Sequence, residues 1–223
     1  MMRTTILVTL VSAICFSGGA RSDEEERVSL FNGKDLDGWV AEGATEYQDK
    51  AGKGQPVWTV QDGLVHCAGH GYGFLRYDKQ EYSDFILHME YRMAPKCNSG
   101  IGIRAAPYDP KRDEASRPSY YSYEIQLLDD AGTKPTKKGS GSLYRYVAPK
   151  ANPVKAAPQW NTIEIECAGP RIKVTINEQV VIDFDQTTLS ETKNKPLKGY
   201  VCLQDHHGVI DFRNIWIREI KSK

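Results

Sequence analysis

The sequence has no excess charge of either sign. Its 223 residues include 29 Lys+Arg and 29 Asp+Glu. Nucleic acids and anionic membranes are bound through basic surfaces, so this balance argues against either as the main partner. Internal repeats and helical periodicity are also missing, apart from one helical turn expected within residues 187–193. Hydrophobic residues at 40% and charged residues at 26% are globular proportions, which excludes a disordered chain.

Long apolar runs are scarce too, and the one near the N-terminus is short. A basic start, a mostly apolar run at Ile6–Phe16 and small residues ending at Ala20 form the pattern of a secretory signal. The run is shorter than the roughly 20 apolar residues that span a bilayer. Cys15 lacks the small residue that precedes it in lipoprotein signals, so no membrane anchor is expected. We predict a signal peptide over residues 1–20, a flexible segment over 21–27, and an exported (periplasmic or extracellular) protein.

The metal-binding motif C-x-x-C does not occur in the sequence. After removal of the signal, Cys67, Cys97, Cys167 and Cys202 remain. Four cysteines in an exported protein allow three disulfide pairings, and the sequence does not choose among them. Buried thiols are the alternative, above all for the cysteines within strand-like runs. The sequence requires no cofactor.

What the sequence does contain is a series of short strand-like runs. They are rich in Val, Ile, Tyr and Trp, and turn-forming residues separate them. Asn177-Glu178 stands between two of them as a hairpin turn. So many strands predict an all-β fold, a two-sheet antiparallel jelly-roll sandwich forming a single domain over residues 28–221. The runs are Val57–Val60, Gly63–Cys67, Phe85–Arg92, Ser99–Arg104, Tyr123–Leu128, Thr162–Cys167, Ile172–Ile176, Gln179–Phe184, Gly199–Gln204 and Ile210–Ile217.

Two segments, Ala105–Ser122 and Ala131–Gln159, interrupt this pattern. Both are longer than the roughly 12–15 residues usual for a loop without a function. They flank the strand expected at Tyr123–Leu128 and contain five tyrosines. We predict that they wall the two ends of a groove; tolerated insertions are the alternative. The tyrosines are Tyr108, Tyr120, Tyr121, Tyr144 and Tyr146.

Side chains alternate along a strand, so their positions sort them into two faces. With the Ile, Val and Leu residues facing the core, the opposite face carries Arg104, Glu124, Gln126, Gln204 and His206. Planar hydrogen-bonding groups together with acid–base groups suit the vicinal hydroxyls of a sugar. If these strands are neighbours, they form a saccharide-binding concave face. An ordinary solvated sheet face is the alternative.

Three further residues are candidates for substrate binding. Asn98 precedes one of these strands, Tyr144 lies in the second long segment, and Glu90 is on the polar face of its own strand.

Asp129 is an odd number of positions from Glu124, so along a regular strand its side chain would point to the opposite face. A β-bulge between the two residues would bring Asp129 to the groove. Two carboxyls there would divide acid and base work. Alternatively, Asp129 ends the strand and begins a turn.

The stretch from Leu30 to Trp39, LFNGKDLDGW, closely resembles the opening motif of the DUF1080 family. This family is also called the 3-keto-disaccharide hydrolase, or 3-keto-glucoside 1,2-lyase/3-keto-2-hydroxy-glucal hydratase, family. The resemblance covers about residues 28–220 and implies a concanavalin A-like lectin/glucanase jelly roll. It continues through Asn98–Arg104, Tyr123–Asp129, Trp160-Asn161, Gly199–His206 and Phe212–Ile215.

The resemblance implies an enzyme that cleaves 3-keto-glycosides by removing the C2 proton, eliminating the C1 aglycone and adding water. Glu124 or His206 would be the base, Arg104 with Gln126 or Gln204 would stabilise the enolate, and Asp129 would be the acid. The spacing Glu-x-Gln-x-x-Asp departs from the Glu-x-Asp-x-x-Glu site of retaining glucanases, so direct displacement on an unmodified glycoside is not expected.

Two questions stay open at this point. A divalent cation would polarise the keto oxygen, with Asp129, His206 and Glu124 as its ligands, although the sequence does not demand one. A non-catalytic, lectin-like carbohydrate-binding module of the same fold is the alternative function. In either case the expected partner is a saccharide; the oligomeric state is not indicated.

Overall fold

The computed structural model describes residues 26–221 of the chain. The predicted signal peptide over 1–20, and most of the segment 21–27, lie outside these residues. Within residues 26–221, no helix has the length and apolar content needed to cross a bilayer.

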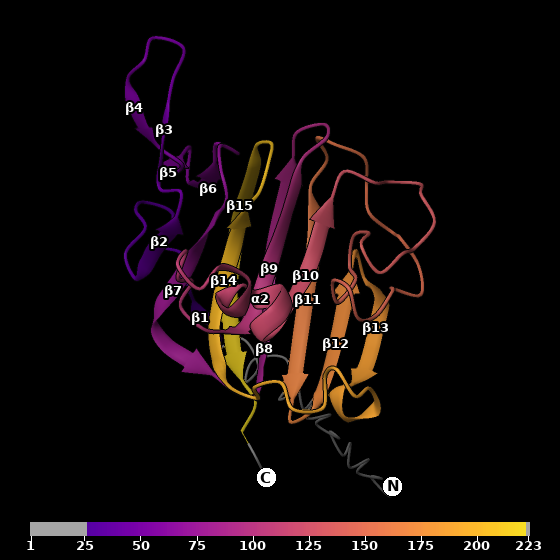
Figure 1. Ribbon diagram of the computed structural model, residues 1–223. Coiled ribbons are helices and arrows are strands. Elements are labelled where there is room, and N and C mark those ends of the chain that lie inside the picture. Colours follow the sequence, from indigo (N-terminus) through magenta and orange to yellow (C-terminus); the bar gives the residue numbers. More distant parts are fainter. Residues whose placement is uncertain (1–25, 222–223) are drawn as a thin grey trace, which may run out of the picture.

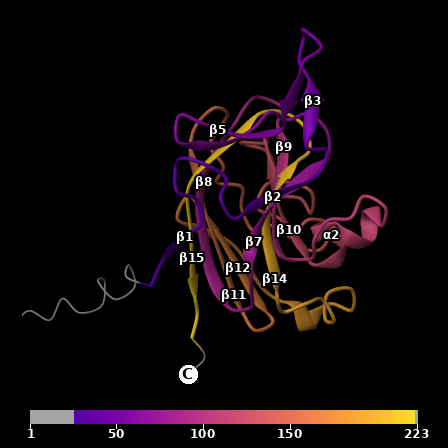
Figure 2. The same ribbon diagram turned by 90° about the vertical axis from the view of Figure 1, so that its left-hand side faces the viewer.

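Two antiparallel sheets pack face to face (Figures 1 and 2). The larger has the order β13 (Gln179–Asp185), β12 (Arg171–Ile176), β11 (Asn161–Ala168), β8 (Phe85–Met93), β15 (Ile210–Glu219), β6 (Leu64–Cys67) and β5 (Trp58–Gln61), and β1 (Val28–Ser29) pairs with β15. The smaller has the order β10 (Tyr123–Leu128), β9 (Asn98–Ala105), β14 (Gly199–Asp205), β7 (Gly73–Tyr82) and β2 (Trp39–Gly43). The predicted all-β jelly-roll sandwich is confirmed.

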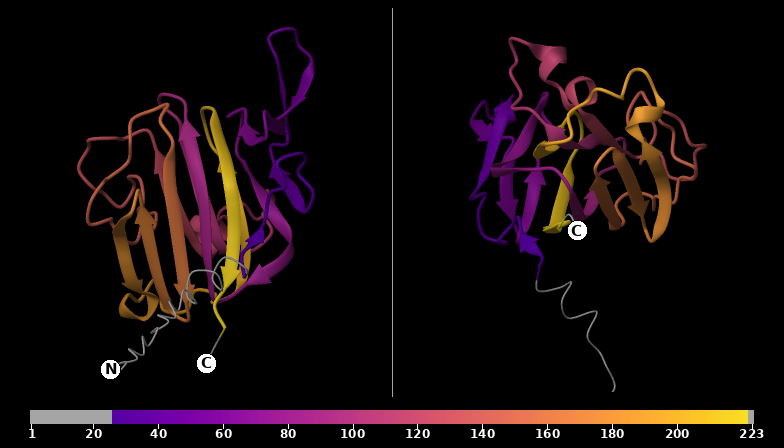
Figure 3. Two further views of the ribbon diagram at one scale, coloured as in Figure 1. Left: turned by 180° about the vertical axis from the view of Figure 1, so that it is seen from behind. Right: turned by 90° about the horizontal axis from the view of Figure 1, so that it is seen from below.

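The remaining elements are small. The hairpin of β3 (Glu46–Gln48) and β4 (Gly54–Pro56) projects beyond the sheets (Figure 3). A 3₁₀ turn, η1 (Asp113–Ser116), and one helical turn, α2 (Pro118–Tyr121), precede β10. Figure 2 shows α2 on the outer side of the smaller sheet. A second 3₁₀ turn, η2 (Gln186–Thr188), overlaps the helical turn expected from the sequence.

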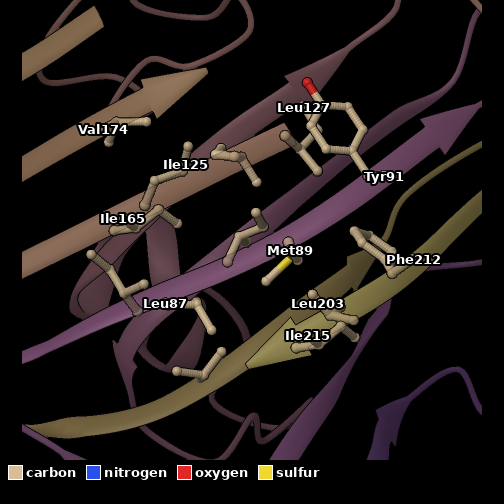
Figure 4. Packing of buried hydrophobic residues seen from close by; sticks show 14 of the residues in the cluster. Leu87, Met89, Tyr91, Ile125, Leu127, Ile165, Val174, Leu203, Phe212 and Ile215 are labelled. Atoms are coloured by element: carbon tan, nitrogen blue, oxygen red, sulfur yellow. The ribbon is translucent and has the colours of Figure 1, made fainter. Parts of the chain in front are cut away.

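The core lies between the sheets and follows the alternation of the strands. Along β8 every second residue is buried, and Leu87, Met89 and Tyr91 meet Ile125 and Leu127 of β10 across the sandwich (Figure 4). Each fully buried side chain of this kind contributes about 1.5–3 kcal/mol through the hydrophobic effect. Because these residues face inward, their polar neighbours on β10 face outward, and this sets the position of the site.

All ten predicted strands are present, with ends that differ by a few residues. The Asn177-Glu178 turn is also confirmed, since both residues have positive φ, 46° and 68°, as a type I′ hairpin requires. The cysteines Cys67, Cys97, Cys167 and Cys202 are all free and buried. The structure therefore has the buried-thiol alternative and none of the three disulfide pairings.

Candidate active site

A cavity of about 460 Å³ lies over the outer face of the smaller sheet. Its floor comes from β10, β9 and β14, and its walls come from the two long segments before and after β10. Both segments contribute lining residues, which confirms the prediction that they wall a groove. The lining residues are Tyr72, Asn98, Arg117, Ser119, Tyr120, Glu124, Gln126, Lys137, Lys138, Tyr144, Arg145, Gln204 and His206.

A glycine of β9, Gly100, makes room for Glu124 on the floor. In the register of β9 with β10, Glu124 lies beside Gly102 and Gln126 beside Gly100. A Cβ atom on Gly100 would come within 2.8 Å of Glu124 Cγ. The Glu124 side chain therefore lies across the space that a larger residue at position 100 would fill.

Substitution of Gly100 by Ala is expected to displace the Glu124 side chain, because the added Cβ would lie 2.8 Å from Glu124 Cγ and 3.0 Å from its Oε1, and the Tm of the variant reports how far the fold accommodates the shift. If Glu124 is catalytic, kcat/KM falls by about 100-fold, the cost of a misplacement near 1 Å. Gly54→Ala is the matched control, since a Cβ there meets nothing closer than 3.8 Å. If the Gly100→Ala protein has a normal Tm and an unchanged kcat/KM, the position of the Glu124 side chain does not limit catalysis, and the prediction is contradicted.

Glu124 is the one acid among the described residues that line the cavity, and its pKa is shifted. Only 4% of its surface is exposed, and burial raises its pKa to about 7. Hydrogen bonding from Gln204 and Ser119 and the charge of Arg117 lower this pKa, although by less than burial raises it. Glu124 therefore exchanges its proton near neutral pH, as a general base requires.

A hydrogen-bonded chain runs along the floor beside Glu124. Gln126 Nε2 donates to Asn98 Oδ1 at 2.9 Å, and Asn98 Nδ2 donates to His206 Nδ1 at 2.9 Å. Since Nδ1 accepts, the neutral imidazole carries its proton on Nε2. Burial lowers the pKa of His206, and the charges of His207 and Arg117 lower it further. His206 is thus a neutral donor at pH 7.

The walls are held by contacts of their own. Arg117 donates from Nε and Nη2 to Asp113 Oδ1, at 2.9 and 2.6 Å, and its guanidinium lies 4.5 Å above the Tyr72 ring. Tyr146 OH donates to the Ser119 carbonyl at 3.1 Å and joins the second segment to the first. These contacts place Arg117 and Ser119 over the floor beside Glu124.

Arg104 is not on the polar face, and this prediction is corrected. Between Gly102 and Ala105, β9 has one residue more than β14, and Arg104 takes a φ of +52°. This bulge reverses the parity and turns the side chain into the interior, where no part of it is exposed. Its guanidinium donates to the Ser83 carbonyl at 3.1 and 2.7 Å and lies 3.5 Å from Asp84.

Asp129 and Glu90 are also outside the cavity. The register of β10 with β9 is regular as far as Leu128, so no bulge turns Asp129 towards Glu124. Its carboxylate instead accepts from the Lys96 amide at 2.8 Å. Glu90 lies in the larger sheet, where Arg213 donates to it at 2.7 Å. The assignments of Asp129 as the acid and Glu90 as a substrate ligand do not fit these positions.

The three residues predicted to bind a divalent cation do not all lie in the cavity. Glu124 and His206 both line the cavity, but Asp129 does not. Among residues 26–221, no group of three or more His, Cys, Asp or Glu side chains is arranged to hold a metal ion. We therefore derive no step through a metal.

The family model of the 3-keto-alpha-glucoside-1,2-lyase-like domain matches residues 26–218. The chain belongs to this family. The resemblance seen in the sequence is thereby confirmed, and the family membership makes this a carbohydrate-active protein. No curated protein matches the sequence.

Solved structures support the fold of this lyase-like family member. Two proteins from Parabacteroides distasonis, provisionally described as glycosyl hydrolases, are similar to it. One has 21% identity and a TM-score of 0.72, with 91% of this chain and 97% of that chain covered. The other has 26% identity and a TM-score of 0.69, with 87% and 99% covered. Carbohydrate-binding module CBM66 from Bacillus subtilis shares the fold, with 13% identity and a TM-score of 0.52. The match covers 82% of this chain and 96% of that chain.

In this family member, sequence reasoning found six residues of the cavity as site candidates: Asn98, Glu124, Gln126, Tyr144, Gln204 and His206. It missed Tyr72, Arg117, Ser119, Lys137, Lys138 and Arg145. Most of these lie in the long segments, where no strand periodicity sorts the side chains. The tyrosines were the only signal there, and two of them, Tyr120 and Tyr144, do line the cavity.

Proposed function

We propose that this protein cleaves 3-keto-glycosides by elimination. The observation that carries the proposal is Glu124, the one carboxylate among the described residues that line the cavity, buried and with a pKa of about 7. Direct hydrolysis of an ordinary glycoside uses two carboxyl groups across the scissile bond. Proton abstraction next to a ketone needs one base and donors for the enolate oxygen. The lining residues match the second requirement.

The reaction begins at C2 of the sugar. Glu124 takes the C2 proton, and the electrons of the C–H bond move to the C3 carbonyl, which becomes an enolate. The enolate re-forms the ketone and a C1–C2 double bond as the C1–O bond breaks, and the departing oxygen takes up a proton. Addition of water, hydroxide to C1 and a proton to C2, then gives the free 3-keto sugar. The net reaction is hydrolysis of the glycosidic bond.

The other lining residues have roles in this scheme. His206 Nε2–H and the Arg117 guanidinium are donors for the enolate oxygen, which is most negative in the transition state. Gln126 Oε1 and Gln204 Oε1 are buried and accept no hydrogen bond within the protein. A buried acceptor without a partner costs about 1–3 kcal/mol, and a sugar hydroxyl that donates to it recovers this cost. These two amides therefore favour a polyhydroxylated ligand.

The test is to mix the protein with an aryl 3-keto-glucoside and with its unoxidised parent, with and without EDTA. We expect aglycone release from the keto form alone, with a transient enone absorbance. Because only ionised Glu124 can take the proton, kcat/KM should rise with pH through about 7 and level off above it. Release from both forms would refute the proposal. Binding of both without release would instead favour the lectin-like alternative. Sensitivity to EDTA would show that a metal takes part.

We further propose that the protein acts outside the cytoplasm. A signal peptide over residues 1–20 would deliver the protein to the periplasm or beyond, where it would meet glycosides outside the cytoplasm.

A further inference from the structure

One side of the cavity carries positive charge that the protein does not neutralise. Lys137, Lys138 and Arg145 line it from exposed positions, and within residues 26–221 none of the three makes an ion pair. The Arg145 guanidinium lies 3.9 Å above the Tyr120 ring, so an aromatic face and not an acid holds it. Arg117 differs, because Asp113 already neutralises it.

The chain fold brings these three cations together. The Arg145 amide donates to the Lys137 carbonyl at 2.8 Å, which folds the second long segment back on itself. Arg145 takes a φ of +76°, a left-handed conformation that is strained for a residue other than glycine. Such strain persists where the surrounding structure enforces it, commonly at ligand sites.

Within residues 26–221 no neighbouring acid forms an ion pair with these cations, although the charge of Lys137 lowers the pKa of Glu191. Lys195 Nζ donates to the Tyr120 carbonyl at 2.6 Å. Its pKa is lowered to about 8, mainly by burial and to a smaller extent by the charge of Arg145. The acid that Lys137 influences, Glu191, is exposed and accepts from Ser190 Oγ at 3.0 Å. None of the acids around this wall enters the cavity, whose single carboxylate is Glu124.

An uncharged 3-keto sugar does not account for so many cations. The enolate has one negative charge and exists only during the reaction, and His206 and Arg117 suffice as its donors. Water weakens the repulsion among these exposed like charges, and an anionic ligand placed between them would replace it by attraction. Lysine and arginine form short, charge-assisted hydrogen bonds with carboxylate, sulfate and phosphate oxygens.

We propose that the cavity takes a glycoside with a fixed negative charge, an anionic oxygen group that lies against Lys137, Lys138 and Arg145. This inference rests on the proposed function in one respect, that the cavity binds a saccharide. It adds the substrate class: an acidic sugar or a sugar with an acidic aglycone.

The test measures binding by calorimetry at low salt with unoxidised probes, which need no turnover. Methyl glucuronide, methyl glucoside 6-sulfate and methyl glucoside 6-phosphate are compared with methyl glucoside. 4-Carboxyphenyl glucoside is compared with 4-carbamoylphenyl glucoside, which has nearly the same shape and no charge. We expect at least one charged probe to bind about tenfold more tightly than its neutral partner, and this preference to weaken with added salt.

The double variant Lys137→Gln/Lys138→Gln should abolish this preference. The matched control Lys134→Gln/Lys150→Gln removes the same charge from exposed positions that do not line the cavity, so it should keep the preference. Equal binding of charged and neutral probes, or no binding by any charged probe, would overturn the inference. So would a preference that survives in Lys137→Gln/Lys138→Gln.

The inference and the proposed function fail in different ways. Turnover of a neutral 3-keto-glucoside without any preference for charged probes would support the elimination and refute the acidic substrate. A preference for charged probes without aglycone release from any 3-keto-glycoside would support the anion site and refute the elimination.

Discussion

Replacement of Glu124 by Gln is expected to lower kcat for aglycone release by about 10²–10⁴-fold, the usual contribution of a general base. Gln has nearly the same shape and retains hydrogen-bonding capacity towards Gln204 and Ser119, but it cannot take the C2 proton. Because sugar hydroxyls still have Gln126 and Gln204 as partners, KM should change far less than kcat. Initial rates on an aryl 3-keto-glucoside between pH 5 and 9 measure both.

The same substitution should stabilise the fold at neutral pH. The pKa of Glu124 is raised from 4.5 to about 7 in the folded protein, so the unfolded chain ionises first as the pH rises. The folded state therefore loses stability between pH 4.5 and 7, and the loss is constant above 7. A shift of this size corresponds to about 3 kcal/mol. Gln titrates in neither state, so Glu124→Gln should gain up to this amount at pH 8 and nothing at pH 4.

Urea denaturation at these two pH values tests the expectation. Glu178→Gln, at an exposed turn position, is the matched control and should change neither rate nor stability by much. Loss of activity without a gain in stability at pH 8 would mean that the Glu124 pKa is ordinary. A gain in stability with full activity would mean that Glu124 is buried for another reason and that the base lies elsewhere.

Replacement of Arg104 by Met should lower the free energy of unfolding by about 3 kcal/mol, with kcat/KM of the folded protein changed by less than about threefold. Arg104 is fully buried away from the cavity, and its loss leaves the Ser83 carbonyl without its donor and Asp84 without its cation. Removal of one partner from a buried pair costs about 3–5 kcal/mol, and the partial exposure of Asp84 reduces this. Thermal unfolding and rates at 20 °C give the two quantities.

The Arg104→Met variant distinguishes a substrate-binding role of Arg104 from a structural one. Strand parity placed Arg104 among the enolate ligands, whereas the structure places it between the sheets. Arg112→Met, at an exposed position in the first long segment, is the control for loss of an arginine. A large fall in kcat/KM with an unchanged Tm would restore the substrate role and contradict the position described above.

Much of the fold was predictable because its signals are local. Apolar residues at alternate positions predicted the strands at 85–92, 123–128 and 199–204, and each is present. The longest strand that was missed, β7 (Gly73–Tyr82), has a polar second half, with Asp78, Lys79, Gln80 and Glu81 all exposed. This strand is held by backbone pairing with β14 and β2, which the pattern of its side chains does not reveal.

The sequence by itself determined that Glu124 and Gln126 share a face, and that Gln204 and His206 share one, because alternation is a property of each strand's own backbone. The tertiary structure alone decided the rest. Whether Arg104 continues that face depends on one extra residue relative to β14, a strand about 100 positions away. The approach of Lys137 to Arg145 and the burial that raises the pKa of Glu124 arise from long segments folding over the sheet. Such contacts join residues that no local pattern relates, so only the folded chain contains them.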